Sequence, residues 1–295
     1  MRVRLVEGEP PPPSEKEREA ALEAVGQAIP HAGRGFLKLV GRDEAANYQV
    51  AVNAEGNYEL LDPQGVAFKN LRPQIKIGEQ GGAAKVVERL VHLYKYDTIQ
   101  QLKNPDAFSP LAGELIVETF KAPLGAKSFK PPVEPTEPLV GPGGMPMIKA
   151  GTKFYLHIKN GSSQDLNIAV LNLDSDWSIE QVVPPDNFGS DTFPLDAKKD
   201  LWLVFTASLN QGYTEGQNTL KIFATVGNAS FRFLELRALD QPFTSLRSKR
   251  NTTGILEHLL ADFNDENPRT RDVKLEVDAS SEWVVAEATI HIIQN

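Results

Sequence analysis

Two aspartates, Asp174 and Asp176, place a pair of carboxylates two residues apart between two predicted strands. Such a pair could contact a hard cation or a substrate hydroxyl. The alternative is a polar turn before Trp177, which is an ordinary use of Asp and Ser in loops. An EF-hand would need further oxygen ligands and a distal Glu at fixed spacing, and the sequence lacks them. We therefore favour the turn and expect no metal ligands.

Nucleophilic catalysis has little support in the sequence. The chain contains no cysteine, which excludes thiolate attack, disulfides and thiolate metal sites. None of the serines lies in a Gly-x-Ser-x-Gly elbow, and the five histidines form no His-x-His or His-Glu-x-x-His pattern. His157 and His291 fall on alternating runs and are interpreted as solvated or edge histidines. We expect no catalytic and no cofactor-binding residues, and no cofactor. A hydrolase with an unrecognised Ser or carboxylate site stays open as a further hypothesis.

Two other groups of residues could form a binding or processing surface. Arg247, Lys249 and Arg250 make a basic cluster in a predicted loop, which is either solvated or an exposed cleavage or docking point. Phe231 and Phe233 lie near a predicted turn. They belong either to the core or to an exposed binding patch.

Size and charge narrow the class of protein. The 295 residues predict two domains, and a net charge of −8 argues against broad binding to nucleic acid, which needs a basic surface. No apolar run approaches the roughly 18 to 20 residues that a membrane span needs. The first residues have no long apolar stretch typical of a secretory signal. We therefore expect a cytoplasmic protein without a membrane partner.

The first part of the chain predicts a small α/β domain over residues 1–110, with the order β-α-β-β-β-α. Residues 2–6 alternate as a strand does, and Ser14 with Glu17 has the spacing of a capping box before an amphipathic helix that ends at Pro30 and Gly33. Residues 48–53 and 57–61 read as a hairpin. A strong helical pattern covers residues 83–103.

The second part, residues 111–295, predicts an Ig-like antiparallel β-sandwich of about seven strands. From Thr152 onward the apolar residues recur every second position, with Phe154, Leu156 and Ile158 on one face. A stretch rich in Pro and Gly, residues 123–151, cannot pair as a central strand and is expected to be a linker or a surface excursion. A short helix is expected near residues 253–263. The predicted fold class is therefore α+β.

Several blocks of sequence, taken in their order, resemble the region C-terminal to the protease domain in bacterial, especially cyanobacterial, caspase-like proteins (orthocaspases and relatives). These blocks are architectural and carry no catalytic motif. They are Tyr58–Asp62, Asn70–Pro73, Arg89–Tyr96, Asn104–Asp106, Ser109–Gly113, Gly212–Gly216, Lys221–Val226 and Glu282–Trp283.

The resemblance implies a role without catalysis. In that family the protease domain supplies a His–Cys dyad, and no position here matches it because the chain has no cysteine. The expected function is an accessory module that acts by protein–protein recognition or by positioning a substrate. Its partner would be a caspase-like protease domain, in cis or in trans, or the protein substrate of that protease. The alternative is an independent β-sandwich that binds a carbohydrate or another small ligand, which the tryptophans and the pair Asp174 and Asp176 motivate.

Overall fold

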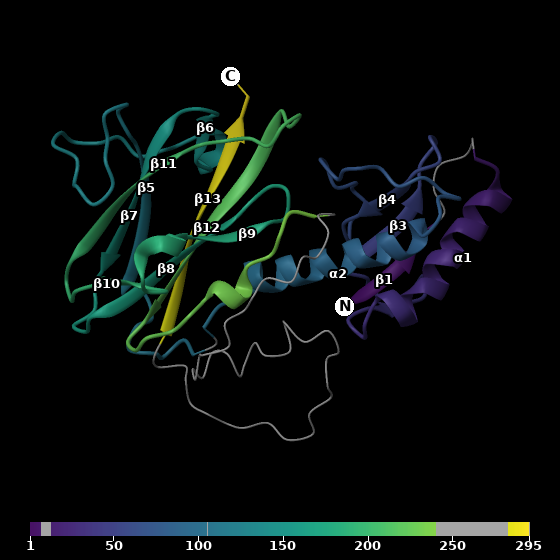
Figure 1. Cartoon of the computed structure of the whole chain (residues 1–295), viewed down its shortest axis with the longest axis horizontal. Helices are drawn as coiled ribbons and strands as arrows, with labels where there is room; N and C mark the ends of the chain where they lie inside the picture. Colours follow the sequence, from purple (N-terminus) through teal and green to yellow (C-terminus); the bar gives the residue numbers. More distant parts are fainter. Residues whose placement is uncertain (7–12, 105, 240–282, 295) are drawn as a thin grey trace. The chain divides into compact units, whose positions relative to one another are not determined.

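The computed structural model describes residues 1–6, 13–104, 106–239 and 283–294 (Figure 1). Among these residues the protein is mixed α/β, with two α-helices and thirteen β-strands. They form two compact units, one built on Met1–Thr98 and the other on Ile99–Arg237 together with the last strand. The sequence predicts the boundary at residue 110, whereas the structure places it after Thr98, because the last turn of the second helix belongs to the second unit. The helix predicted near residues 253–263 lies outside the described residues.

The first unit combines a four-stranded sheet with two helices. The strands are β1 (Arg2–Leu5), β2 (Lys38–Leu39), β3 (Tyr48–Val52) and β4 (Tyr58–Leu61), and the helices are α1 (Glu15–Ala32) and α2 (Gly82–Gln101). The strand order is β2-β1-β3-β4. β1 runs parallel to both β2 and β3, and the predicted hairpin gives the antiparallel pair β3–β4.

Helix α1 begins at the predicted capping box and ends at the predicted Gly33. The Ser14 side chain accepts a hydrogen bond from the Glu17 amide, and the Glu17 carboxylate accepts one from the Ser14 amide, which completes the capping box. The helix ends at Ala32 with Gly33 as its C-cap, so the predicted end at Gly33 is confirmed, whereas Pro30 lies inside the helix and does not end it. A proline in the last turn removes a single helical hydrogen bond, and the Gly33 amide still donates to the Ile29 carbonyl at 2.9 Å.

The second unit is built from strands, with three short 3-10 helices. Its strands are β5 (Leu115–Lys121), β6 (Met147–Lys149), β7 (Lys153–Asn160), β8 (Leu166–Leu173), β9 (Ile179–Val183), β10 (Phe193–Leu195), β11 (Asp200–Thr206), β12 (Glu215–Thr225) and β13 (Trp283–Ile293). The 3-10 helices are η1 (Pro142–Gly144), η2 (Asp186–Phe188) and η3 (Arg232–Leu234). The short strands β6 and β10 are additions to the predicted set.

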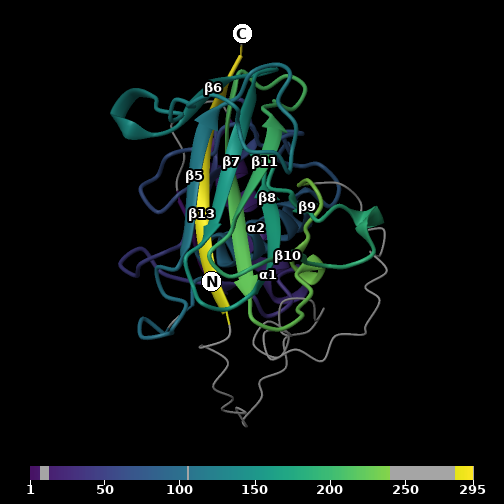
Figure 2. The ribbon, with the colours of Figure 1, turned by 90° about the vertical axis from the view of Figure 1, so that its left-hand side faces the viewer.

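The strands of the second unit form two sheets that share one apolar core (Figure 2). The larger sheet has the order β10-β8-β12-β13-β6, with β9 also paired to β8, and the smaller sheet has the order β11-β7-β5. All pairs are antiparallel except β13 with β6, which is parallel. The predicted inward face of β7 is confirmed, because Phe154, Leu156 and Ile158 all lie in the core.

In the described part of the chain, neither helix is both long and apolar enough to cross a membrane.

Candidate functional site

The Pro-rich segment between β5 and β7, residues 122–150, is fixed to both edges of the smaller sheet; we call it the strap. At the β11 edge, the Phe129 amide donates to the Trp202 carbonyl at 2.6 Å, and the Ser128 hydroxyl accepts from the Val204 amide at 2.9 Å. At the β5 edge, the Leu139 amide donates to the Thr119 carbonyl at 2.9 Å. The segment is therefore a surface excursion with defined anchors rather than a free linker.

Exposed aromatic rings gather where the strap meets β11. Phe129 is 55% exposed and its ring stacks on Phe193 at 5.2 Å, while Phe188 is 45% exposed and lies 5.6 Å from the same ring. We call these three residues the aromatic trio. They border an apolar cavity of about 200 Å³, whose other walls include Val183, Pro184, Leu203 and Phe205. Exposed rings beside an apolar cavity are typical of surfaces that receive an anchor residue of a partner.

The backbone of Phe129 supports a functional interpretation of the aromatic trio. Its φ is +64°, in the left-handed region that bulky residues rarely adopt. This conformation costs roughly 1–2 kcal/mol for an L-residue. Folding alone would favour a glycine here, so the strain and the exposed ring together indicate a position kept for contact.

A larger cavity, of about 800 Å³, lies between the strap and β7. Tyr155 contributes to its wall although the residue is only 4% exposed, and within the described residues its hydroxyl makes no hydrogen bond. The strap supplies the prolines of the other walls and, together with Lys121 of β5, a charged rim. The rim residues are Lys121, Lys127, Lys130, Glu134 and Glu137, of which Lys121 and Glu137 form an ion pair at 2.7 Å.

His157 lies at the centre of the smaller sheet's outer face, in the cross-strand row Glu118–His157–Trp202. Its ring stacks on Trp202 at a centroid distance of 4.1 Å and an interplanar angle of 17°. The Nδ1 atom lies 3.2 Å from a Glu118 carboxylate oxygen, and Nε2 lies 2.9 Å from one of Asp200. The side chain is only 13% exposed, so the prediction of a solvated or edge histidine is wrong.

The two carboxylates beside His157, those of Glu118 and Asp200, lie against its two ring nitrogens. Asp200 also accepts a hydrogen bond from the Trp202 indole at 3.0 Å. Partial burial opposes its ionisation, but the bonds from His157 and Trp202 outweigh this and hold the pKa of Asp200 below its ordinary value. Because both imidazole nitrogens face carboxylates, neither is directed at a substrate proton as general-base catalysis requires. Among the described residues, no group of His, Asp and Glu side chains has the geometry of a metal site. The arrangement can present a rigid aromatic surface.

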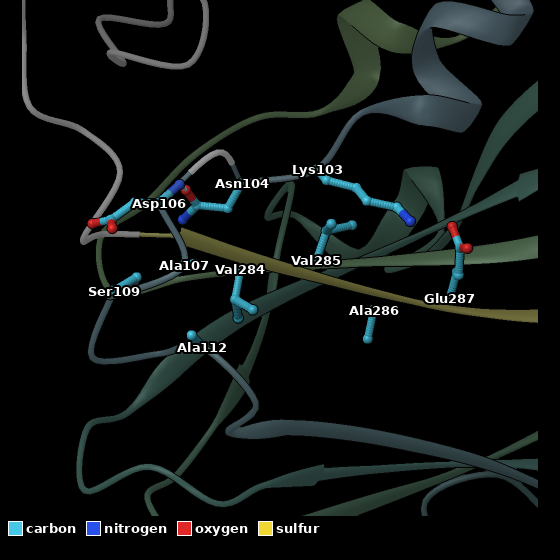
Figure 3. Close-up of a pocket in the computed structure, with 10 residues that line it drawn as sticks. All are labelled: Lys103, Asn104, Asp106, Ala107, Ser109, Ala112, Val284, Val285, Ala286 and Glu287. Atoms are coloured by element: carbon cyan, nitrogen blue, oxygen red, sulfur yellow. Dashed lines mark hydrogen bonds between the residues drawn. The ribbon is translucent and has the colours of Figure 1, made fainter.

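A third pocket, of about 320 Å³, runs along β13 (Figure 3). One wall is the loop after α2, with Lys103, Asn104 and Asp106, and the other is the consecutive run Val284–Glu287. The Asn104 side-chain amide donates to the Trp283 carbonyl at 2.5 Å and fixes the loop to the start of the strand.

Lys221 of β12 is fully buried behind this pocket. Its ammonium donates to the Gln100 carbonyl at 2.6 Å, in the last turn of α2, and lies 3.4 Å from a Glu287 carboxylate oxygen. Desolvation lowers the pKa of Lys221, and the nearby Glu287 charge works against that shift. A cation that binds the final carbonyls of a helix is a stabilising cap, so we interpret Lys221 as structural.

The pair Asp174 and Asp176 lies in the turn between β8 and β9. The Asp174 carboxylate accepts from the Ser175 amide at 2.6 Å and faces the side-chain amides of Asn172 and Asn210, each 3.4 Å away. Asp176 accepts from the Ser178 amide at 3.0 Å. Burial, together with the charge of Asp176, raises the pKa of Asp174. These contacts are those of a polar turn, and the donors around Asp174 occupy the oxygens that a cation would need.

The structure does not bring the other predicted binding residues to one surface. Phe231 is fully buried and stacks on Phe223 at 4.6 Å, so it belongs to the core and not to an exposed binding patch, and Phe233 is partly buried. The residues that follow β12 fold back onto the outer face of the larger sheet and bury the Phe223 side chain there. Arg247, Lys249 and Arg250 lie outside the described residues.

Sequence reasoning missed the aromatic trio, the cross-strand row of His157 and the pocket beside β13. One signal was available for the trio, since Phe129 and Phe188 are aromatic residues in segments where Pro, Gly and Asp exclude a core strand. The row and the pocket depend on strand pairing, which the sequence does not specify.

No protein-family model matches the chain, and the curated proteins contain no match.

Proposed function

We propose that the chain is a non-catalytic module that recognises another protein through the strap and the aromatic trio. The observation that carries this proposal is the exposure of Phe129 and Phe188 beside an apolar cavity. Large exposed apolar side chains also concentrate in the strap, which holds five of the eleven in the described residues: Leu124, Phe129, Val133, Val140 and Met145. Apolar side chains clustered on a proline-stiffened segment bind with little loss of conformational entropy.

The proposed partner is a caspase-like protease domain, in cis or in trans, or the protein substrate of that protease. The sequence resemblance supports this choice, and the absence of a cysteine supports a role other than that of the protease itself. The proposal includes an Ig-like antiparallel β-sandwich for the second unit, preceded by a β-α-β-β-β-α domain, and a cytoplasmic location.

The test compares the wild-type chain with the double variant Phe129→Ser, Phe188→Ser in binding to an isolated cyanobacterial caspase-like protease domain. We expect measurable binding by the wild type and a loss of about tenfold or more in the double variant, because exposed aromatic anchors carry much of an interface's energy. The matched control is Val66→Ser in the first unit, an exposed apolar side chain (62%) outside the strap.

Equal affinity of the wild type and the double variant would contradict the proposed surface. The chain alone, offered fluorogenic peptides that contain Arg or Asp, should show no hydrolysis. Turnover that persists in the purified chain would contradict the non-catalytic role.

A second candidate function is the binding of a carbohydrate or another small ligand in the 800 Å³ cavity under the strap. The Tyr155 hydroxyl favours it, since a polar group in a largely apolar wall can orient a ligand. Tyr155 meets Trp202 edge-on at 5.6 Å, so a ligand at Tyr155 should change the tryptophan fluorescence. Titration with glycans and with calcium tests this, and Tyr155→Phe, which removes only the hydroxyl, should weaken a genuine response. A flat titration of the wild type would eliminate this candidate.

A further inference from the structure

The loop between β9 and β10, which carries Phe188, is held at its base by one arginine. Arg232 of η3 forms ion pairs with Asp186 and with Asp191, the latter at 3.2 Å. Its guanidinium also donates to the Pro184 carbonyl at 3.0 Å. Because the Arg232 side chain is only 23% exposed, these contacts are screened less by water than those of a surface pair. Its partners precede and follow Phe188 in the chain, so one side chain fixes both ends of the loop.

A buried glutamine holds the same two ends. The Gln181 side-chain amide donates to the Asp191 carbonyl at 2.9 Å and to the Pro184 carbonyl at 3.4 Å. The segment that carries the arginine is itself fixed to β9, because Ile179 and Leu236 exchange two backbone hydrogen bonds of 2.8 and 2.9 Å. The loop therefore has a defined position before any partner binds, which lowers the entropy that binding costs.

The cavity beside this loop has walls without charge. None of the eleven described residues that line it is ionisable, and four of them are phenylalanines. Ser128 carries the one polar side chain of the lining, and its hydroxyl oxygen already accepts the Val204 amide. A charged side chain would lose its water in this cavity and find no counter-ion, which is costly. The lining therefore selects an apolar side chain.

The volume of the cavity decides between classes of apolar side chain. An apolar cavity of roughly 150 Å³ is enough to bind benzene. The cavity here has about 200 Å³ and so accommodates a phenyl ring. The phenylalanine rings of its walls can meet that ring edge-on or in an offset stack, a contact that stabilises beyond the area it buries. An aliphatic side chain gains no such contact.

We propose that this cavity receives one uncharged aromatic side chain, a phenylalanine, from an exposed segment of the partner. Arg232 acts as a positioning residue, since it does not line the cavity but fixes the loop that carries Phe188. The inference rests on the proposed function, because it specifies which residue the partner inserts at the aromatic trio.

The test titrates the full chain with three acetylated and amidated peptides, Gly-Ser-X-Ser-Gly, in which X is Phe, Leu or Lys. NMR follows the backbone amides of the strap and of the loop between β9 and β10. The Phe peptide should give saturable shifts, with a dissociation constant on the order of a few millimolar for one buried ring. The Leu peptide should bind about fivefold more weakly, and the Lys peptide should give no saturable shift.

Variants of the chain separate the cavity from its frame. Phe188→Ser removes a wall and should abolish binding of the Phe peptide. Arg232→Met keeps the apolar stem, and it should weaken binding about threefold to tenfold because the open cavity is then populated for only part of the time. Asp191→Asn is the milder second variant and should weaken binding about twofold. Arg34→Met changes an exposed arginine of the first unit and serves as the matched control.

Each part of the proposal has a result that would overturn it. Equal affinity for the Phe and Leu peptides would contradict an aromatic anchor, and absence of shifts at millimolar Phe peptide would remove the site. Arg232→Met and Asp191→Asn that bind like the wild type would exclude the positioning role, since a purely structural role lowers stability without changing the affinity of the folded chain. Binding of the Phe peptide without binding of the protease domain would contradict only the proposed partner.

Discussion

The two sheets of the second unit differ in how far their edge strands are covered by hydrogen-bonded neighbours. The strap covers both edges of the smaller sheet, with Ser128 and Phe129 on β11 and Leu139 on β5. In the larger sheet, no strand within the described residues is hydrogen-bonded to the outer side of β13 between the Asn104 contact at Trp283 and the ladder with β6. Both edges belong to one unit with one core. The strap therefore covers both edges of the smaller sheet, whereas through β6 it covers only the last three residues of β13 in the larger sheet.

A proline substitution should strongly destabilise the fold at Leu139, beside β5, and only slightly at Val285 of β13. This is the largest effect that we predict. Leu139→Pro removes the hydrogen bond to the Thr119 carbonyl together with a buried side chain. Leu139→Ala alone should cost about 2–5 kcal/mol in the free energy of unfolding, and the proline should add about 1–3 kcal/mol because it leaves a carbonyl unpaired. At Val285 the difference between Pro and Ala should stay below about 1 kcal/mol.

Urea unfolding of Leu139→Pro, Leu139→Ala, Val285→Pro and Val285→Ala measures how much more proline costs than alanine at each position. Similar proline penalties at Leu139 and Val285 would contradict the distinction between a covered and an open edge. Size-exclusion chromatography adds a second readout, because an uncovered β5 edge should promote self-association in Leu139→Pro.

Ser128 tests the other covered edge with a smaller change. Ser128→Ala removes the acceptor of the Val204 amide and should cost about 1 kcal/mol in the free energy of unfolding. Ser128→Thr keeps the hydroxyl and serves as the control. The Val204 amide should exchange its hydrogen faster in Ser128→Ala than in Ser128→Thr. Unchanged exchange would show that the strap does not protect this edge.

The smallest predicted effect concerns pH. The pKa of Asp200 is lower in the folded protein than in the unfolded chain, so its ionised form stabilises the fold above an ordinary carboxyl pKa of about 4, and this contribution disappears as the pH falls through the folded pKa. Because the side chain is half exposed, the contribution should be below about 1 kcal/mol. Unfolding free energies at pH 3 and pH 7 should differ less in Asp200→Asn than in the wild type. An identical pH dependence would exclude this role for Asp200.

The sequence predicted the elements of the fold better than their contacts. The capping box at Ser14, the hairpin of β3 and β4, and the inward face of β7 were readable because each depends on neighbours a few residues away. The strands β6 and β10 were not predicted. They are only three residues long, and their pairing partners lie far away in the chain.

The site was less predictable than the fold. The turn at Asp174 and Asp176 follows from local chemistry, and the structure agrees with it. The sequence could not decide between core and surface for Phe231, because its burial depends on a contact with Phe223 of β12. The row Glu118–His157–Trp202 comes from three strands and forms only because of their pairing register. The unpaired stretch of β13 likewise depends on which strands lie beside it in the sheet. Neither property is local.

Residue-resolved hydrogen exchange along β13 tests the central claim most directly. If the edge is open, the amides of Val285 and Glu287 should exchange rapidly, while those of Ala286 and Ala288, which face β12, should be protected. Uniform protection of all four amides in the free protein would show that the edge is already occupied and would contradict the account.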